Sequence, residues 1–169
     1  MKKNTPLPVD YILARLSVDV LTGVAYWKDA TKHHRNLVGR VAGCRKEASS
    51  GKYYWIIKIN GTVYNRSYIV FAVATGSWPG AQIDHKNGDS LDDRASNIRL
   101  ATATQNAWNH KKRARKIQLP MGVRHSIYKT FVARITVNKK QIYLGSFKSP
   151  DEAANEYKSA RATYFGEFA

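Results

Sequence analysis

The dipeptide Asn60-Gly61, set between two β-rich runs, most constrains how this chain can fold. The runs at 53–59 and 62–64 are dominated by aromatic and β-branched side chains. Both central residues of a type I′ turn need positive φ, which Asn and Gly accept readily, so this pattern is the strongest short signal of a β-hairpin. Short apolar runs alternate with turn residues throughout residues 11–80, and the apolar run 68–74 is compatible with either a buried helix or a strand.

A second hairpin is predicted between residues 81 and 101. Ile83-Asp84-His85 ends its first strand, a turn and a polar loop follow, and Asn97 precedes the returning run 98–101. Thr102-Ala103-Thr104-Gln105 has the spacing of a capping box, in which hydroxyl and amide groups satisfy the first backbone donors of a helix. The sequence therefore predicts a helix from about residue 103 to 114.

The last third of the chain has the pattern of a separate small domain. Strand patterns occupy 122–125, 131–137 and 141–147, with a turn expected at Asn138-Lys139. Ser149-Pro150 followed by two acidic residues is typical of a helix start, and this helix is predicted to run to about residue 164. Three strands and one helix are expected.

Charge indicates the kind of partner. The 28 Lys and Arg residues exceed the 12 Asp and Glu residues and give a formal net charge of +16. Such a field attracts polyanions, and nucleic acid is favoured over a membrane surface or an acidic protein. Residues 111–116 carry five positive charges in six positions and are interpreted as a linker in contact with phosphates, the alternative being a solvated helix end.

Other features exclude several classes of protein. The single Cys44 excludes an internal disulfide and any zinc site that needs two thiolates. No run of residues approaches the ~20 apolar residues that cross a bilayer, and no apolar segment follows the first lysines. A cytoplasmic protein without a membrane association is expected.

Four polar side chains of the second hairpin and its helix suggest a hydrolytic site. If these elements pack as a ββα unit, Asp84 and Asn106 converge beside His85, with Asn97 nearby. Carboxylate and amide oxygens suit Mg²⁺ or Mn²⁺, and an imidazole can take a proton from water near neutral pH. These are the parts of a phosphodiester hydrolase. Three further acids of the loop are interpreted as turn and capping residues, because the calcium-loop pattern is absent: Asp89, Asp92 and Asp93.

The segments 83–89, 97–100 and 104–106 resemble the HNH endonuclease family, in the phage and intron-homing subgroup whose final histidine is replaced by asparagine. The resemblance implies that Asp84 and Asn106 hold one divalent cation, Mg²⁺ or alternatively Mn²⁺. It implies that His85 activates the water and that Asn97 ties the loop and orients His85. His110 lies at the spacing where some HNH nucleases place a further metal ligand, and the alternatives are a phosphate contact or a solvent-facing helix residue.

The segment 121–169 resembles a second family, the plant ethylene-response (APETALA-type) DNA-binding domain, whose three-stranded sheet enters the major groove. Met121 stands where an arginine is frequent in that family. The resemblance implies that one face of the sheet contacts DNA, as the basic linker is expected to do. The expected DNA-binding residues are Lys111, Lys112, Arg113, Arg115, Lys116, Arg124, Lys129, Arg134, Thr136, Lys139 and Tyr143.

Together these patterns predict an α+β protein, with a ββα-metal module followed by a small three-stranded antiparallel sheet and a helix. The expected domains are 1–112, with a nuclease core at 81–112, a basic linker at 113–120, and 121–169. The expected function is metal-dependent cleavage of double-stranded DNA at a specific long target, as in phage or group I intron homing, in the host cytoplasm if phage-encoded. No obligate protein partner is expected. The alternatives are a non-catalytic DNA-binding regulator and a nonspecific or structure-selective phage nuclease.

Overall fold

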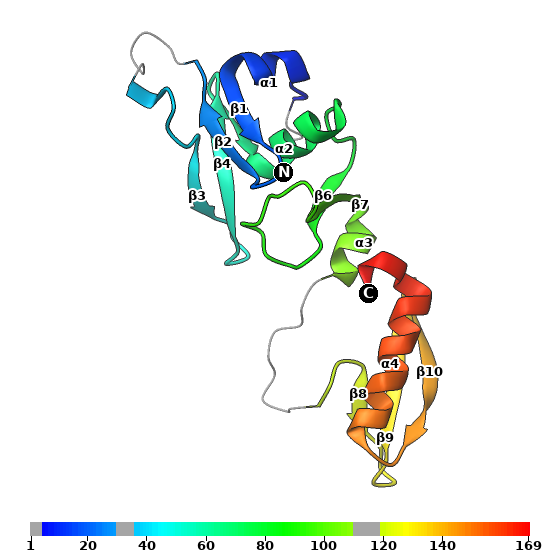
Figure 1. Ribbon diagram of the computed structural model, residues 1–169. Coiled ribbons are helices and arrows are strands. Elements are labelled where there is room, and N and C mark those ends of the chain that lie inside the picture. The colour runs from blue at the N-terminus through cyan, green and yellow to red at the C-terminus, as the bar shows by residue number, and fades with distance from the viewer. Residues whose placement is uncertain (1–4, 30–35, 110–118) are drawn as a thin grey trace. The chain divides into compact units, whose positions relative to one another are not determined.

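The computed structural model describes residues 5–29, 36–109 and 119–169 (Figure 1). The chain is a mixed α+β protein that forms two compact units, 1–103 and 104–169. The predicted domain limit at 112 lies outside the described ranges, and the limit at 120 lies close to their next start at 119. Both limits remain predictions. Each unit is considered separately below.

The first half of unit 1 is built from hairpins around two helices. Asn60 and Gly61 have φ angles of 48° and 78°, so the turn predicted between them is confirmed. The run 68–74, for which the sequence left helix and strand open, is helical. The elements are α1 (Val9–Arg15), β1 (Leu16–Asp19), β2 (Val24–Trp27), β3 (Cys44–Glu47), β4 (Tyr53–Ile59), β5 (Thr62–Asn65) and α2 (Arg66–Thr75). Strands β3, β4 and β5 form an antiparallel sheet, and β1 pairs with β2.

Helix α2 contributes to two apolar clusters of unit 1. Ile69 packs in the larger cluster together with Ile12, Leu16 and Ile57, all of which are buried. Val70, the next residue of the helix, packs instead against Ile83 and Ile98. These last two residues belong to β6 (Gln82–His85) and β7 (Ile98–Ala101), which form the predicted second hairpin. The hairpin is thus fixed to the core through α2.

Unit 2 contains a three-stranded antiparallel sheet with a helix packed against it. The strands are β8 (Val123–His125), β9 (Phe131–Val137) and β10 (Lys140–Phe147), in the order β10-β9-β8. Helix α4 (Pro150–Phe165) packs on the sheet through Ala153 and Tyr157 and is followed by the 3-10 turn η2 (Gly166–Phe168). The predicted helix start is confirmed, because the Ser149 hydroxyl accepts a hydrogen bond from the Glu152 amide at 3.1 Å.

Two predictions about turns and helices have different outcomes in unit 2. Asn138 and Lys139 both have positive φ, 49° and 66°, as the predicted turn requires. Helix α3 spans Ala103–Trp108, and the rest of its predicted length, beyond residue 109, lies outside the described residues.

In the part of the chain that the structure describes, no helix is long and apolar enough to cross a membrane.

Candidate active site

Strand β6 ends with two buried polar residues, Asp84 and His85, which are 4% and 8% exposed. The antiparallel register places Asp84 opposite Arg99 on β7. The Arg99 Nε and Nη2 atoms both lie 2.9 Å from Asp84 Oδ2. A buried carboxylate needs such a partner because burial without one is strongly unfavourable. The hairpin therefore holds the Asp84 carboxylate in a fixed orientation.

A buried polar network surrounds the imidazole of His85. Its Nε2 atom lies 2.8 Å from Asp93 Oδ1. Arg66, the first residue of α2, donates from Nε to Asp93 Oδ2 at 2.8 Å and from Nη2 to the Leu91 carbonyl at 3.1 Å. The Arg66 guanidinium also lies over the Trp55 ring, 4.8 Å from its centroid. The Asp93 carboxylate thus links the His85 imidazole to Arg66 of α2, and Arg66 in turn contacts Trp55 of β4.

The interpretation of Asp93 as a turn or capping residue is wrong. Its side chain is 2% exposed and pairs with groups 8 and 27 positions away. Asp89 does act as a turn residue, since its Oδ1 atom accepts a hydrogen bond from the Leu91 amide. Sequence reasoning missed Asp93 and Arg66. The available signal was that Arg66 stands between the β-rich run 62–64 and the apolar run 68–74, where a buried charge requires an opposite charge.

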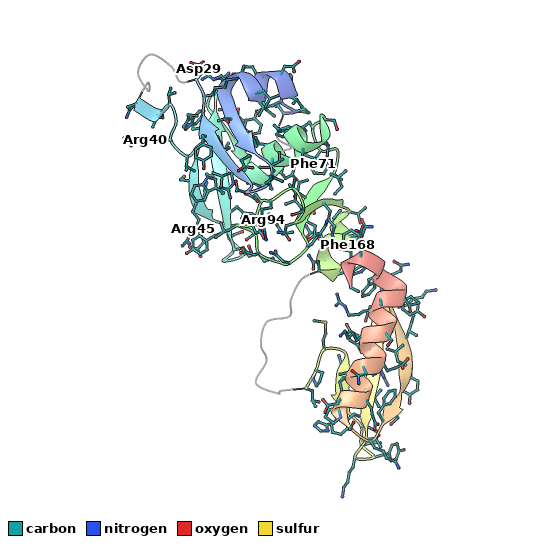
Figure 2. All side chains as sticks on the ribbon, in the orientation of Figure 1. Asp29, Arg40, Arg45, Phe71, Arg94 and Phe168 are labelled. Atoms are coloured by element: carbon teal, nitrogen blue, oxygen red, sulfur yellow. The ribbon has the colours of Figure 1, made fainter. Side chains whose placement is uncertain are left out.

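Asp92 lies beside this network but is bonded elsewhere. Its carboxylate accepts hydrogen bonds from Arg94 Nε at 2.7 Å and Nη2 at 2.6 Å, and from Asn87 Nδ2 at 2.8 Å. The hydrogen bonds from Arg94 lower the pKa of Asp92 to about 2, against an opposing effect of desolvation. Figure 2 labels Arg94 on the loop between β6 and β7. The Asp92–Arg94 pair stabilises the loop.

Asn97 joins the two ends of the loop between β6 and β7. Its Oδ1 atom accepts a hydrogen bond from the Asn87 amide at 3.1 Å, and its Nδ2 donates to the Asp92 carbonyl at 2.7 Å. Its own carbonyl accepts from the Lys86 amide at 2.8 Å. These bonds close the loop immediately after His85, and Asn97 is only 8% exposed.

The predicted site residues fall into four groups, of which the last, on the sheet of unit 2, is described below. Asp84, His85 and Asn97 lie together on the β6–β7 hairpin of unit 1. Asn106 lies on α3, in unit 2, and its share in the site remains a prediction. A third group falls outside the described residues: His110, Lys111, Lys112, Arg113, Arg115 and Lys116.

The donor set is compatible with a hard divalent cation. In residues 5–29, 36–109 and 119–169, no group of three or more His, Cys, Asp or Glu side chains is placed to hold a metal ion. A Mg²⁺ ion keeps several waters and needs only one or two protein oxygens. One carboxylate with an amide oxygen fits this requirement.

The sheet of unit 2 presents a polar face opposite α4. Ala133 and Ile135 of β9 are buried, whereas the alternate residues Arg134 and Thr136 are exposed. Arg134 pairs in register with Tyr143 of β10 and donates from Nη1 to Gln141 Oε1 at 3.1 Å. The predicted DNA-binding residues that the structure describes in this unit are all exposed: Arg124, Lys129, Arg134, Thr136, Lys139 and Tyr143.

Comparison with known proteins classifies the hairpin region. Residues 64–108 match the family described as HNH endonuclease. These residues include α2, the β6–β7 hairpin and α3, and with them Arg66, Asp84, His85, Asp93, Asn97 and Asn106. Residues 64–108 are thus similar to an HNH endonuclease domain.

A solved structure resembles part of the chain. It is titled "DNA binding and cleavage by the HNH homing endonuclease I-HmuI" and is 18% identical in sequence, with a TM-score of 0.42. The similarity covers 62% of this chain and 56% of the other, so this chain matches little more than half of that protein. A search of the curated proteins found no match.

Proposed function

We propose that the protein is a metal-dependent DNA endonuclease in which the β6–β7 hairpin and α3 form a ββα-metal site. The observation that carries the proposal is the pair Asp84 and His85, buried side by side at the end of β6 within the residues that match the HNH endonuclease family. The Asp84 carboxylate would bind the ion and the His85 imidazole would take up the proton, so the two steps are assigned to separate side chains.

Asp84 and Asn106 would hold the divalent cation, with Mg²⁺ as the expected ion and Mn²⁺ as the alternative. When bound, such a cation stabilises the negative charge on the phosphate and on the leaving oxygen. The ion pair with Arg99 is compatible with this role, because a carboxylate has about four acceptor positions. Arg99 holds Asp84 Oδ2 from the neighbouring strand and limits the rotation of the ligand.

His85 is proposed as the general base. One of its ring nitrogens takes a proton from a water molecule, and the remaining hydroxide forms a new bond to phosphorus. The phosphorus bond to one sugar oxygen then breaks, and that oxygen takes a proton from solvent as the imidazolium later releases its own. The products are one phosphate monoester end and one hydroxyl end. Asn97 is proposed to keep the loop closed so that His85 stays oriented.

The sheet of unit 2 is proposed to bind double-stranded DNA as an APETALA-type domain. What supports this is the exposed face of β9 and β10, where Arg134 lies beside Thr136 and Tyr143. Arginine gives bidentate contacts to guanine in the major groove, whereas lysine mainly attracts phosphates. Residues 111–116 are proposed to follow the DNA backbone. A nuclease with a separate DNA-binding unit can recognise a long specific target, as phage and intron homing require. Cleavage is proposed to take place in the cytoplasm of the host.

Cleavage of long DNA tests the proposal. Protein incubated with plasmid and phage DNA in Mg²⁺ should produce discrete fragments or nicks, and a chelator should abolish them. His85→Ala should bind the same DNA with similar affinity and leave it intact. A ladder on every substrate would indicate a nonspecific nuclease instead of a homing enzyme. Binding without cleavage in Mg²⁺ and Mn²⁺ would indicate a DNA-binding regulator and contradict the proposal.

A further inference from the structure

The hydrogen bond between His85 and Asp93 constrains the position of a proton. The Nε2 atom of His85 lies 2.8 Å from Asp93 Oδ1, and both side chains are buried. An ionised carboxylate only accepts hydrogen bonds, so the nitrogen that faces it must carry a proton. In the neutral ring the other nitrogen, Nδ1, is then the unprotonated and basic one.

Arg66 binds the other oxygen of the Asp93 carboxylate. Its Nε atom donates to Asp93 Oδ2 at 2.8 Å, on the carboxylate oxygen that does not face His85. The guanidinium is itself held by the Leu91 carbonyl and by the Trp55 ring. Arginine remains charged at all relevant pH values, so the carboxylate faces a permanent positive charge. The two oxygens of Asp93 are thus divided between a fixed cation and the imidazole.

We infer that Asp93 is a positioning residue, which fixes the tautomer of His85 so that Nδ1 is the nitrogen that takes the proton from water. This inference rests on the proposed function of His85 as the base. It adds a residue that lies eight positions beyond His85, on the loop between β6 and β7. Asp93 does not touch the substrate and acts only through the imidazole.

Nitrogen NMR of His85 tests the tautomer without any substrate. Long-range proton–nitrogen spectra of the full chain, with His85 assigned by comparison with His85→Ala, distinguish a protonated from an unprotonated ring nitrogen. The wild-type ring should show a protonated Nε2 and an unprotonated Nδ1. In Asp93→Asn the amide offers both a donor and an acceptor, so the ring should sample both tautomers. An unprotonated Nε2 in the wild-type protein would overturn the inference.

Cleavage kinetics then test the consequence. Asp93→Asn should lower kcat by about 10²- to 10⁴-fold, the range associated with loss of an oriented base, and should leave KM within about threefold. Asp92→Asn is the matched control, because it makes the same chemical change in the next residue, which bonds Arg94 and Asn87. It should retain kcat within about threefold. Equal kcat values for Asp93→Asn and the wild type would overturn the inference.

A double variant separates positioning from charge neutralisation. If Asp93 only neutralises buried Arg66, then Arg66→Met with Asp93→Leu should restore cleavage, because apolar residues of similar volume often replace a buried ion pair without loss of stability. If Asp93 orients His85, the double variant folds, as its thermal unfolding reports, but cleaves as slowly as Asp93→Asn. Recovery of wild-type kcat would overturn the inference. Absence of cleavage by the wild type would instead contradict the proposed function, and the NMR result would still decide the tautomer.

Discussion

Gly23, in the turn between β1 and β2, lies directly against the backbone of Asp93. A Cβ atom added to Gly23 would lie 2.4 Å from the carbonyl carbon of Asp93 and 2.5 Å from the nitrogen of Arg94. In the same turn the Val20 carbonyl accepts a hydrogen bond from the Ala95 amide at 2.9 Å. The N-terminal hairpin therefore supports the loop that carries Asp93.

Gly23→Ala should destabilise unit 1 strongly. Its φ of +72° lies in the left-handed region, and the added methyl group meets backbone atoms that cannot rotate away. Backbone strain of about 1 kcal/mol is expected at such a position, and the clash should raise the total loss above about 2 kcal/mol. Denaturant unfolding measures this loss, and the cleavage rate should fall with it.

Gly76→Ala is the control for this prediction. Gly76 has a similar φ of +75° at the end of α2, but no atom lies within 4 Å of its added Cβ. It should therefore show the strain alone, about 1 kcal/mol. Equal losses for Gly76→Ala and Gly23→Ala would mean that the close approach to Asp93 contributes nothing to stability.

Local patterns were sufficient to predict the turns and several of the elements. The Asn60-Gly61 hairpin and the helix start at Ser149 depend on residues within three or four positions of one another, and both were predicted correctly. The run 68–74 was ambiguous because burial on several sides removes the periodicity that separates helix from strand. Only packing against two clusters, through Ile69 and Val70, decides that it is a helix.

Long-range pairing was not predictable in the same way. The sequence motif identified Asp84 and His85 through their spacing from Asn97, because those distances along the chain are fixed within a hairpin. It did not identify Asp93, since the partners of that carboxylate lie on β6 and on α2. Three acids of the loop look alike in sequence, and only the fold selects which one is buried.

The Asp92–Arg94 pair should make stability depend on pH. Arg94 lowers the pKa of Asp92 from an ordinary value of 3.8 to about 2 in the folded protein. A lowered folded pKa stabilises the protein above pH ~4, and this contribution is lost as pH falls toward 2. Because Arg94 is 54% exposed, solvent screening reduces the contribution to about 1 kcal/mol.

Unfolding measurements on two variants check this dependence. Wild-type protein should exceed Asp92→Asn in unfolding free energy by about 1 kcal/mol at pH 6, and the difference should vanish near pH 2. Arg94→Gln should also be less stable than the wild type at pH 6, because it removes the same ion pair. The double variant should add little to either single loss, since the two side chains form one interaction. A difference that stays constant from pH 6 to pH 2 would contradict the prediction.

DNA binding should depend on the exposed arginines of unit 2. Affinity should fall steeply as the salt concentration rises. In a plot of log K against the logarithm of the salt concentration, the slope should be about −0.9 for each phosphate that the protein neutralises. Arg134→Ala should weaken binding by about 1 to 3 kcal/mol if the side chain reads a base edge, and should reduce discrimination between target and unrelated DNA. Electrophoretic or fluorescence titrations at several salt concentrations measure both effects.

Lys158→Ala is the matched control for the sheet. Lys158 is exposed on α4, and this helix packs on the face of the sheet opposite Arg134. Replacing Lys158 by Ala removes one positive charge, as Arg134→Ala does. It should change affinity by no more than a few tenths of a kcal/mol and leave discrimination unchanged. Equal effects of the two substitutions would indicate that general charge, and not the sheet face, binds DNA.

Helix α3 should depend on Trp108 for its position within unit 2. The Trp108 ring stacks on Phe165 with centroids 4.4 Å apart and an interplanar angle of 17°. Arg161 adds a hydrogen bond from Nη2 to the Trp108 carbonyl at 3.0 Å. Trp108→Ala should lower the unfolding free energy of unit 2 by about 2 kcal/mol, less than for a fully buried ring. Amides of α3 should then exchange faster with solvent. Tyr164→Ala is the control, because it removes an aromatic ring that precedes Phe165 in the sequence but is 44% exposed. It should change neither the unfolding free energy nor the exchange rate of the α3 amides by much. If both variants behave alike, the stacking does not anchor α3.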